Sequence, residues 1–175
     1  MLLTVSCTVS TPADSTNSQE PVSIYPEYTD VTVPLNIAPL RFTIENEGEE
    51  FITQLRSGNQ EYCYAGSDVC PSQKQWKKLT AASQDIEVTI YVKRHDKWLR
   101  MKAFHFYVSQ DRIDPYIAYR LIAPSYVDYE ELTINQRCLE NYDEKVIYGT
   151  MSNSTEKDGQ CINCLSFQQY NPDRM

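Results

Sequence analysis

Two cysteines near the end of the chain, Cys161 and Cys164, have the spacing C-x-x-C. Two thiols at this spacing can bind a metal ion, form a redox disulfide, or hold haem covalently. A c-type haem site needs a histidine directly after the second cysteine as its iron ligand, and Leu165 occupies that position. Zinc needs a second ligand pair, but the two histidines, His95 and His105, lie far away in sequence. The pair is therefore interpreted as a structural disulfide or two packed thiols, with a degenerate haem-type motif as the alternative.

The four remaining cysteines have different predicted roles. Cys63 and Cys70 flank a short segment that could form a hairpin tip, which makes them a disulfide candidate. The alternative is two independent small apolar side chains. Cys138 is then left over as a free thiol. Cys7 follows a short apolar stretch and precedes a tail rich in Ser, Thr and Pro, which is the layout of a bacterial lipoprotein signal, so Cys7 is the lipidation candidate.

Catalytic constellations are not evident from the residue pattern. The chain has six carboxylates between residues 128 and 144. Paired carboxylates can hydrolyse glycosides, but scattered surface charge explains these six residues more simply. The carboxylates concerned are Asp128, Glu130, Glu131, Glu140, Asp143 and Glu144. His95 in a charged turn and His105 in an aromatic strand receive no catalytic role. We therefore expect no enzyme activity and no metal site.

Composition narrows the class of protein further. The chain has 175 residues, a net charge of −8 and a pI of about 4.8, which disfavours binding to a nucleic-acid backbone. Six cysteines suggest an exported chain or thiols with a chemical function. The sequence has 13 Tyr and only 5 Gly, which favours strands over glycine-rich phosphate-binding loops.

Period-two alternation of apolar and polar residues predicts strands over most of the middle of the chain. The clearest hairpin combines residues 86–93, a turn at 94–97 and a return strand at 98–108. Residues 71–79 are predicted to be helical, with Trp76 and Leu79 on one face and Pro71 in the first turn. Shorter strands are predicted at residues 41–45, 51–56, 60–64 and 116–122.

These elements predict a mainly β protein, an immunoglobulin-like antiparallel β-sandwich with one short helix. Residues 1–21 are expected to contain a signal or lipobox remnant and a disordered tether. Residues 22–124 are expected to form the sandwich with an extended first segment. Residues 125–175 are expected to be a mixed tail ending in the C-x-x-C pair.

Several strings in the chain resemble a known family. They are residues 24–34, 36–40, 119–127, 135–137 and 160–164. They are similar to Bacteroidetes envelope proteins described as TolB-like or WD-repeat-like propeller proteins, sometimes as cytochrome c biosynthesis proteins. In that family the last motif reads C-I-N-C-H-S-F and precedes a β-propeller, so Leu165 departs from the pattern. The resemblance implies the N-terminal part of a larger protein, truncated before the propeller.

Together these observations predict a non-enzymatic lipoprotein domain of the cell envelope with an interaction or scaffolding role. The expected location is the periplasmic face or the outer membrane. The expected partners are the membrane, through the lipid on Cys7, and an envelope protein or a glycan, but not nucleic acid. No cofactor is expected, although haem c is implied for the family. The alternatives are a haem or redox module using Cys161 and Cys164 and a carbohydrate-binding module, favoured by the many tyrosines.

Overall fold

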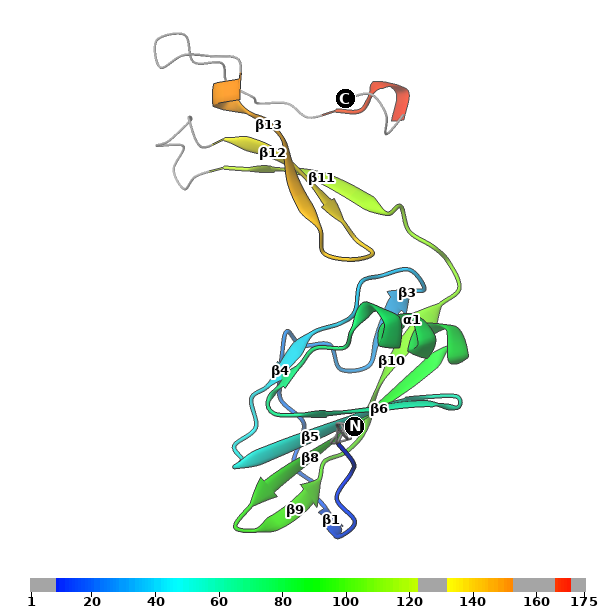
Figure 1. The fold of residues 1–175 in the computed structure, drawn as a ribbon, viewed down its shortest axis with the longest axis vertical. Coiled ribbons are helices and arrows are strands. Elements are labelled where there is room, and N and C mark those ends of the chain that lie inside the picture. Colours follow the sequence, from blue (N-terminus) through cyan, green and yellow to red (C-terminus); the bar gives the residue numbers. More distant parts are fainter. Residues whose placement is uncertain (1–8, 123–131, 153–165, 171–175) are drawn as a thin grey trace, which may run out of the picture. The chain divides into compact units, whose positions relative to one another are not determined.

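The computed structural model of the chain describes residues 9–122, 132–152 and 166–170 (Figure 1). These residues form two compact units, one ending at Ile113 and the other beginning at Asp114. The fold is mainly β with one short α-helix and is consistent with a β-sandwich, which confirms the predicted class. Within the described ranges, no helix is both long and apolar enough to cross a bilayer.

The N-terminal unit contains a seven-stranded sheet and a three-stranded sheet. The larger sheet consists of β1 (Ser15–Asn17), β3 (Val31–Pro34), β5 (Glu50–Ser57), β6 (Gln60–Ala65), β8 (Asp85–Arg94), β9 (Lys97–Arg100) and β10 (Phe104–Ser109). The smaller sheet consists of β2 (Ile24–Tyr25), β4 (Phe42–Ile44) and β7 (Asp68–Val69). Both sheets and helix α1 (Gln73–Ala82) contribute to one core, which includes Phe42, Leu55, Val69, Trp76 and Phe106.

Strand β8 is central to the larger sheet. β5 pairs with one of its edges, whereas β9 and β10 share the other edge. The alternation that predicts this strand also decides its burial, because every second side chain faces the core. The side chains concerned are Ile86, Val88, Ile90 and Val92, all with no exposed surface. His95 and Asp96 have positive φ angles of 48° and 60°, as a two-residue hairpin turn requires. The predicted hairpin is confirmed for β8 and β9, but the return strand expected over residues 98–108 is divided into β9 and β10, which both pair with β8.

Helix α1 is confirmed, but it begins later than predicted. Ser72 is the N-cap, and its side chain accepts a hydrogen bond from the Gln75 amide while the Gln75 side chain accepts one from the Ser72 amide. This capping box satisfies two amides that would otherwise lack partners. Pro71 therefore precedes the cap instead of occupying the first turn. Trp76 and Leu79 are buried, as their spacing predicts.

Residues 9–20, expected to be a disordered tether, lie against the larger sheet. β1 pairs in parallel with β9, and the Ser18 amide donates to the Arg100 carbonyl at 2.9 Å. Arg94 donates two hydrogen bonds to the Glu20 carboxylate, at 2.7 and 3.0 Å. The sequence did not reveal this strand because the three side chains of β1 are all exposed, so the strand depends on backbone hydrogen bonds.

Replacing Glu20 with glutamine should loosen β1. The hydrogen bond from Arg94 lowers the pKa of Glu20, so its contribution to stability is complete above the unfolded-state pKa of about 4.3 and is lost as the pH falls through the lower folded-state pKa. For such a partly exposed pair we expect amide exchange in β1 to accelerate about two- to fivefold in Glu20→Gln at pH 7. Hydrogen-exchange mass spectrometry at pH 7 and pH 3 tests this. An equal difference in the exchange rate of β1 between the two proteins at both pH values would contradict this prediction.

The C-terminal unit contains a three-stranded antiparallel sheet in the order β11-β12-β13. Its elements are β11 (Tyr116–Leu121), β12 (Thr133–Cys138), β13 (Glu144–Gly149) and the 3-10 turns Thr150–Ser152 and Gln168–Tyr170. The sequence predicts β11 as the last strand of the sandwich, with a boundary at residue 124. Instead, β11 pairs with β12 along its whole length, so the chain divides before Asp114.

Candidate functional site

The cysteines with the most specific predicted roles lie outside the described residues. These are the lipidation candidate Cys7 and the haem-type pair Cys161 and Cys164, together with Leu165. Lipidation and the degenerate haem motif therefore stay predictions. The described cysteines, Cys63, Cys70 and Cys138, are free thiols.

The predicted disulfide between Cys63 and Cys70 does not form in the structure. Cys63 lies in β6, which pairs with β5 in the larger sheet. Cys70 follows β7, which pairs with β4 in the smaller sheet. The segment between them is thus a crossover from one sheet to the other, turned by Gly66 at a φ of 95°, and is not a hairpin tip.

The two thiols should differ in reactivity. Burial raises the pKa of Cys63, and the nearby Glu61 carboxylate adds to the effect, whereas Cys70 is exposed. Because the thiolate is the reactive form, iodoacetamide at pH 8 should alkylate Cys70 several-fold faster than Cys63. Peptide mapping of protein purified without reductant measures both rates. Recovery of a Cys63–Cys70 linked peptide would contradict the structure.

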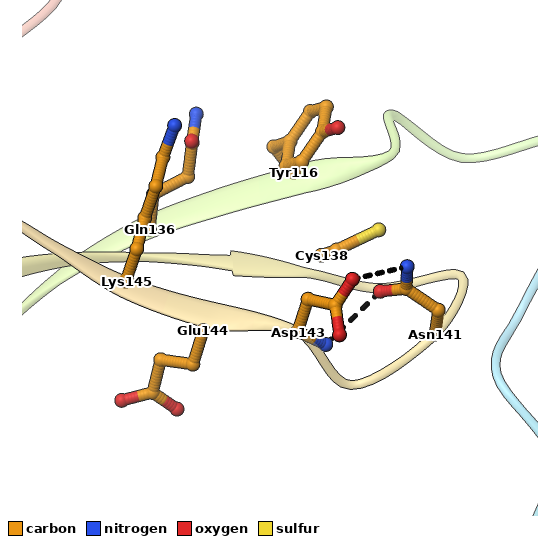
Figure 2. Close-up of a pocket in the computed structure, with 7 residues that line it drawn as sticks. All are labelled: Tyr116, Gln136, Cys138, Asn141, Asp143, Glu144 and Lys145. Atoms are coloured by element: carbon orange, nitrogen blue, oxygen red, sulfur yellow. Dashed lines mark hydrogen bonds between the residues drawn. The ribbon is translucent and has the colours of Figure 1, made fainter.

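Only some of the six carboxylates that the sequence analysis interprets as scattered surface charge lie in the described residues. Asp128, Glu130 and Glu131 lie outside the described residues. Asp143 faces a cleft on the C-terminal sheet, whereas the side chain of the adjacent Glu144 points away from it (Figure 2). These two carboxylates are therefore not brought together as an acid–base pair. Within the described ranges, no group of three His, Cys, Asp or Glu side chains is placed to hold a metal ion.

The two histidines lie on exposed parts of the N-terminal unit. His95 occupies the turn between β8 and β9. The His105 Nδ1 atom lies 2.7 Å from Asp85 Oδ1, and the His105 ring stacks on Tyr107 with centroids 5.8 Å apart. These contacts account for His105 as a surface residue of β10.

A polar cleft of about 220 Å³ lies on one face of the C-terminal sheet (Figure 2). It is lined by Tyr116, Gln136, Cys138, Asn141, Asp143, Lys145 and Glu144, of which only the Glu144 side chain points away from the cleft (Figure 2). The register explains this grouping, because Tyr116 lies opposite Cys138 and Gln136 lies opposite Lys145, which puts these side chains on the same face. The cleft offers amide, carboxylate, ammonium and phenol groups for binding.

The turn between β12 and β13 shapes one end of the cleft. Asn141 Nδ2 donates to Asp143 Oδ2 at 2.6 Å, and the Asp143 amide donates to Asn141 Oδ1 at 3.0 Å. The Cys138 amide donates to the Asp143 carbonyl at 2.7 Å, which closes the turn. Tyr142, which lies between Asn141 and Asp143, has a φ of 69°. Asn and Asp favour such turns because their short side chains bond to nearby backbone amides.

The opposite face of the same sheet exposes aliphatic side chains. Ile117, Tyr119 and Leu121 alternate along β11 and therefore share one face. Val146 joins them because it lies opposite Asn135, which also lies opposite Tyr119. Ile117, Leu121 and Val146 are 46%, 50% and 59% exposed. We call the surface formed by Ile117, Tyr119, Leu121 and Val146 the apolar face.

Polar side chains lie among the aliphatic residues of the apolar face. The Tyr119 hydroxyl hydrogen-bonds to Glu144, which raises the pKa of Tyr119, and Arg137 also hydrogen-bonds to Tyr119. Arg137 lies opposite both Ile117 and Glu144 in the register, and its guanidinium lies 5.3 Å from the centre of the Tyr142 ring. The aliphatic side chains of this face therefore lie on the edge strands β11 and β13, on either side of Asn135 and Arg137 of β12.

Sequence reasoning missed both surfaces of this sheet. Residues 125–150 have no clear period, so β12 and β13 were not predicted from the sequence. The available signal was the run of β-forming residues from Val146 to Tyr148 and the presence of apolar residues on both faces of β11. A strand with apolar residues on both faces either packs against other elements on both sides or exposes one apolar face to solvent.

Comparison with known proteins adds no relative: no protein-family model, curated protein or solved structure matches the chain. The class is therefore defined by the fold and the site together. This is a mainly β protein whose C-terminal sheet has an apolar face on one side and a polar cleft on the other.

Proposed function

We propose that this chain is a non-enzymatic interaction module of the bacterial cell envelope and that its apolar face binds a protein partner. The observation that carries the proposal is the exposure of Ile117, Leu121 and Val146 on one face of a three-stranded sheet. Small sheets are stable in water when they can bury an apolar face. Contiguous exposed apolar groups on soluble proteins mark binding surfaces.

The composition of the surface favours a protein as the partner. Protein interfaces have an apolar centre and a polar rim, with arginine and tyrosine enriched. The apolar face combines exposed aliphatic side chains on β11 and β13 with Arg137 on β12 and with the Tyr119 hydroxyl. The ion pair of Arg137 with Glu144, at 3.9 Å, leaves little net charge there. A matching partner would present apolar side chains with hydrogen-bonding groups between them.

Membrane attachment through a lipid on Cys7 is the second part of the proposal. A lipid chain holds a protein at a membrane surface without a spanning helix. The short apolar stretch before Cys7 and the resemblance to envelope lipoproteins that carry a propeller support this placement. An anchored module of this kind would bring its partner to the periplasmic face or the outer membrane.

Site-specific photo-crosslinking tests the interaction. A photoreactive amino acid replaces Val146 in one strain and the exposed Glu61, in the N-terminal unit, in a control strain. Irradiation of intact cells of the source bacterium should give a discrete adduct of defined mass from position 146 and none from position 61. No adduct at position 146, or the same adducts from both positions, would overturn the proposal.

Replacing Cys7 with serine should release the protein from the membrane fraction, because serine cannot receive the thioether-linked lipid. Cell fractionation and metabolic labelling with an alkyne fatty acid measure the change. The matched control is Cys70→Ser, which removes an exposed thiol elsewhere and should leave the membrane fraction unaltered. Unchanged labelling in Cys7→Ser would exclude this residue as the anchor.

A further inference from the structure

An open groove of about 550 Å³ lies in the N-terminal unit, where β1 meets the turn between β8 and β9. It is lined by Asp14, Ser15, Thr16, Asp96, Lys97 and Trp98. Its size is within the range of ligand sites in proteins. It is built by the N-terminal segment, because Asp14, Ser15 and Thr16 all belong to the segment that pairs with β9.

Trp98 provides the one aromatic surface of this groove. In the register, Trp98 lies between Lys93 on β8 and Ser15 on β1, so the three side chains share one face of the sheet. Trp98 is half-buried. The half-buried indole is thus placed beside the Ser15 hydroxyl and the Lys93 side chain.

The two tryptophans of the chain differ in how their indole N–H groups are satisfied. Trp76 is 1% exposed and donates to the Ile37 carbonyl at 3.0 Å. Among the described residues, no acceptor is found for the Trp98 indole N–H. Tryptophans usually find a hydrogen-bond partner when they are buried. The free N–H of Trp98 is therefore available to a ligand in the groove.

Lys93 beside Trp98 is already paired with Glu50 at 2.6 Å, but other polar groups that line the groove have no such partner. Within the described residues, the side chains of Asp14, Ser15 and Lys97 form no hydrogen bond to another residue. Together they provide carboxylate acceptors, a hydroxyl and an ammonium donor in the groove that Trp98 also lines. The groove carries charges of both signs, from Asp14 and Asp96 against Lys97, which favours an uncharged ligand rich in hydroxyl groups.

We propose that this groove binds a neutral oligosaccharide, with one sugar ring stacked on the Trp98 indole. A pyranose ring has an apolar face of C–H groups and an equatorial edge of hydroxyls that both donate and accept hydrogen bonds. The indole contacts the apolar face, and Asp14, Ser15 and Lys97 bond to the hydroxyls. The open groove admits a chain of several sugars. This binding is independent of the proposed protein contact, because the apolar face lies in the other unit.

Intrinsic fluorescence tests the groove, because the two tryptophans report on separate environments. The full chain is titrated with cellohexaose, maltohexaose, xylohexaose and chitohexaose, each to about 10 mM, a concentration that detects weak binding. We expect a saturable change in emission with at least one of these sugars. In Trp98→Phe, where the buried Trp76 is the remaining fluorophore, the change should disappear.

Two further variants separate binding from folding. Asp14→Asn replaces an exposed carboxylate, keeps Trp98 and should weaken binding about fivefold through loss of one hydrogen bond. Tyr107→Thr removes another exposed aromatic side chain of the same unit, outside the groove, and should bind like the original protein. The proposal is overturned if none of the four sugars gives a saturable change, or if the change persists in Trp98→Phe.

Discussion

Replacing Phe106 with alanine should lower the free energy of unfolding of the N-terminal unit by about 3–5 kcal/mol. Phe106 has no exposed surface, and its ring contacts three other aromatic rings. The centroid distances are 6.3 Å to Phe42, 5.5 Å to Phe104 and 6.1 Å to Trp76, all in edge-to-face geometry. The substitution removes the shared partner of a cluster that joins β4, β10 and α1, so the neighbouring rings cannot close the resulting cavity without losing their own contacts.

Urea denaturation followed by the fluorescence of Trp76 and Trp98 measures this change. The matched control is Tyr107→Ala in the same strand, because Tyr107 is 43% exposed and points to the opposite face. Its cost should be below about 1 kcal/mol. If the two alanine variants unfold at the same urea concentration, Phe106 is not in the core and the packing described above is wrong.

Placing aspartates on the apolar face should abolish the proposed interaction. The double variant Ile117→Asp, Val146→Asp removes two aliphatic contacts and introduces carboxylates that the partner would have to bury. Burying one unpaired polar group costs about 2 kcal/mol, so the affinity should fall by at least about 30-fold. Because both residues are exposed in the free protein, its stability should change little.

The crosslinking experiment provides the readout, with the photoreactive amino acid at position 121. The adduct should disappear in the double variant and persist in the control Lys145→Asp. Lys145 is adjacent to Val146 in β13 but faces the polar cleft, so the control adds an aspartate to the same strand on the opposite side (Figure 2). Equal loss of the adduct in both proteins would assign the effect to net charge and contradict a role for the apolar face.

The parts of the fold that could be predicted from the sequence are those whose pattern decides their burial. The hairpin of β8 and β9 could be predicted because the alternating residues of β8 face one core and the turn residues tolerate positive φ. The division of the expected return strand, residues 98–108, into β9 and β10 could not be predicted from this alternation. Helix α1 was predicted because Trp76 and Leu79 have helical spacing. Its first residue was misjudged because the Ser72 capping box, and not Pro71, determines where the helix begins.

The remaining parts depend on partners that are distant in sequence. β1 has three exposed side chains and exists because β9 offers it an open edge and Arg94 binds Glu20. The disulfide expectation failed because residues between Cys63 and Cys70 cross between sheets, which depends on β4. The apolar face likewise depends on strand register. Val146 and Tyr119 share a face because both lie opposite Asn135 of β12.

The central claim is that the apolar face is covered in the cell. Hydroxyl-radical footprinting compares side-chain oxidation in the purified chain with oxidation in intact envelopes, and Tyr25, which is 69% exposed in the N-terminal unit, serves as the internal reference. We expect Ile117, Leu121 and Val146 to be oxidised several-fold less in the envelope, while the oxidation of Tyr25 is unchanged. Equal oxidation of the three aliphatic residues in both samples would contradict this claim.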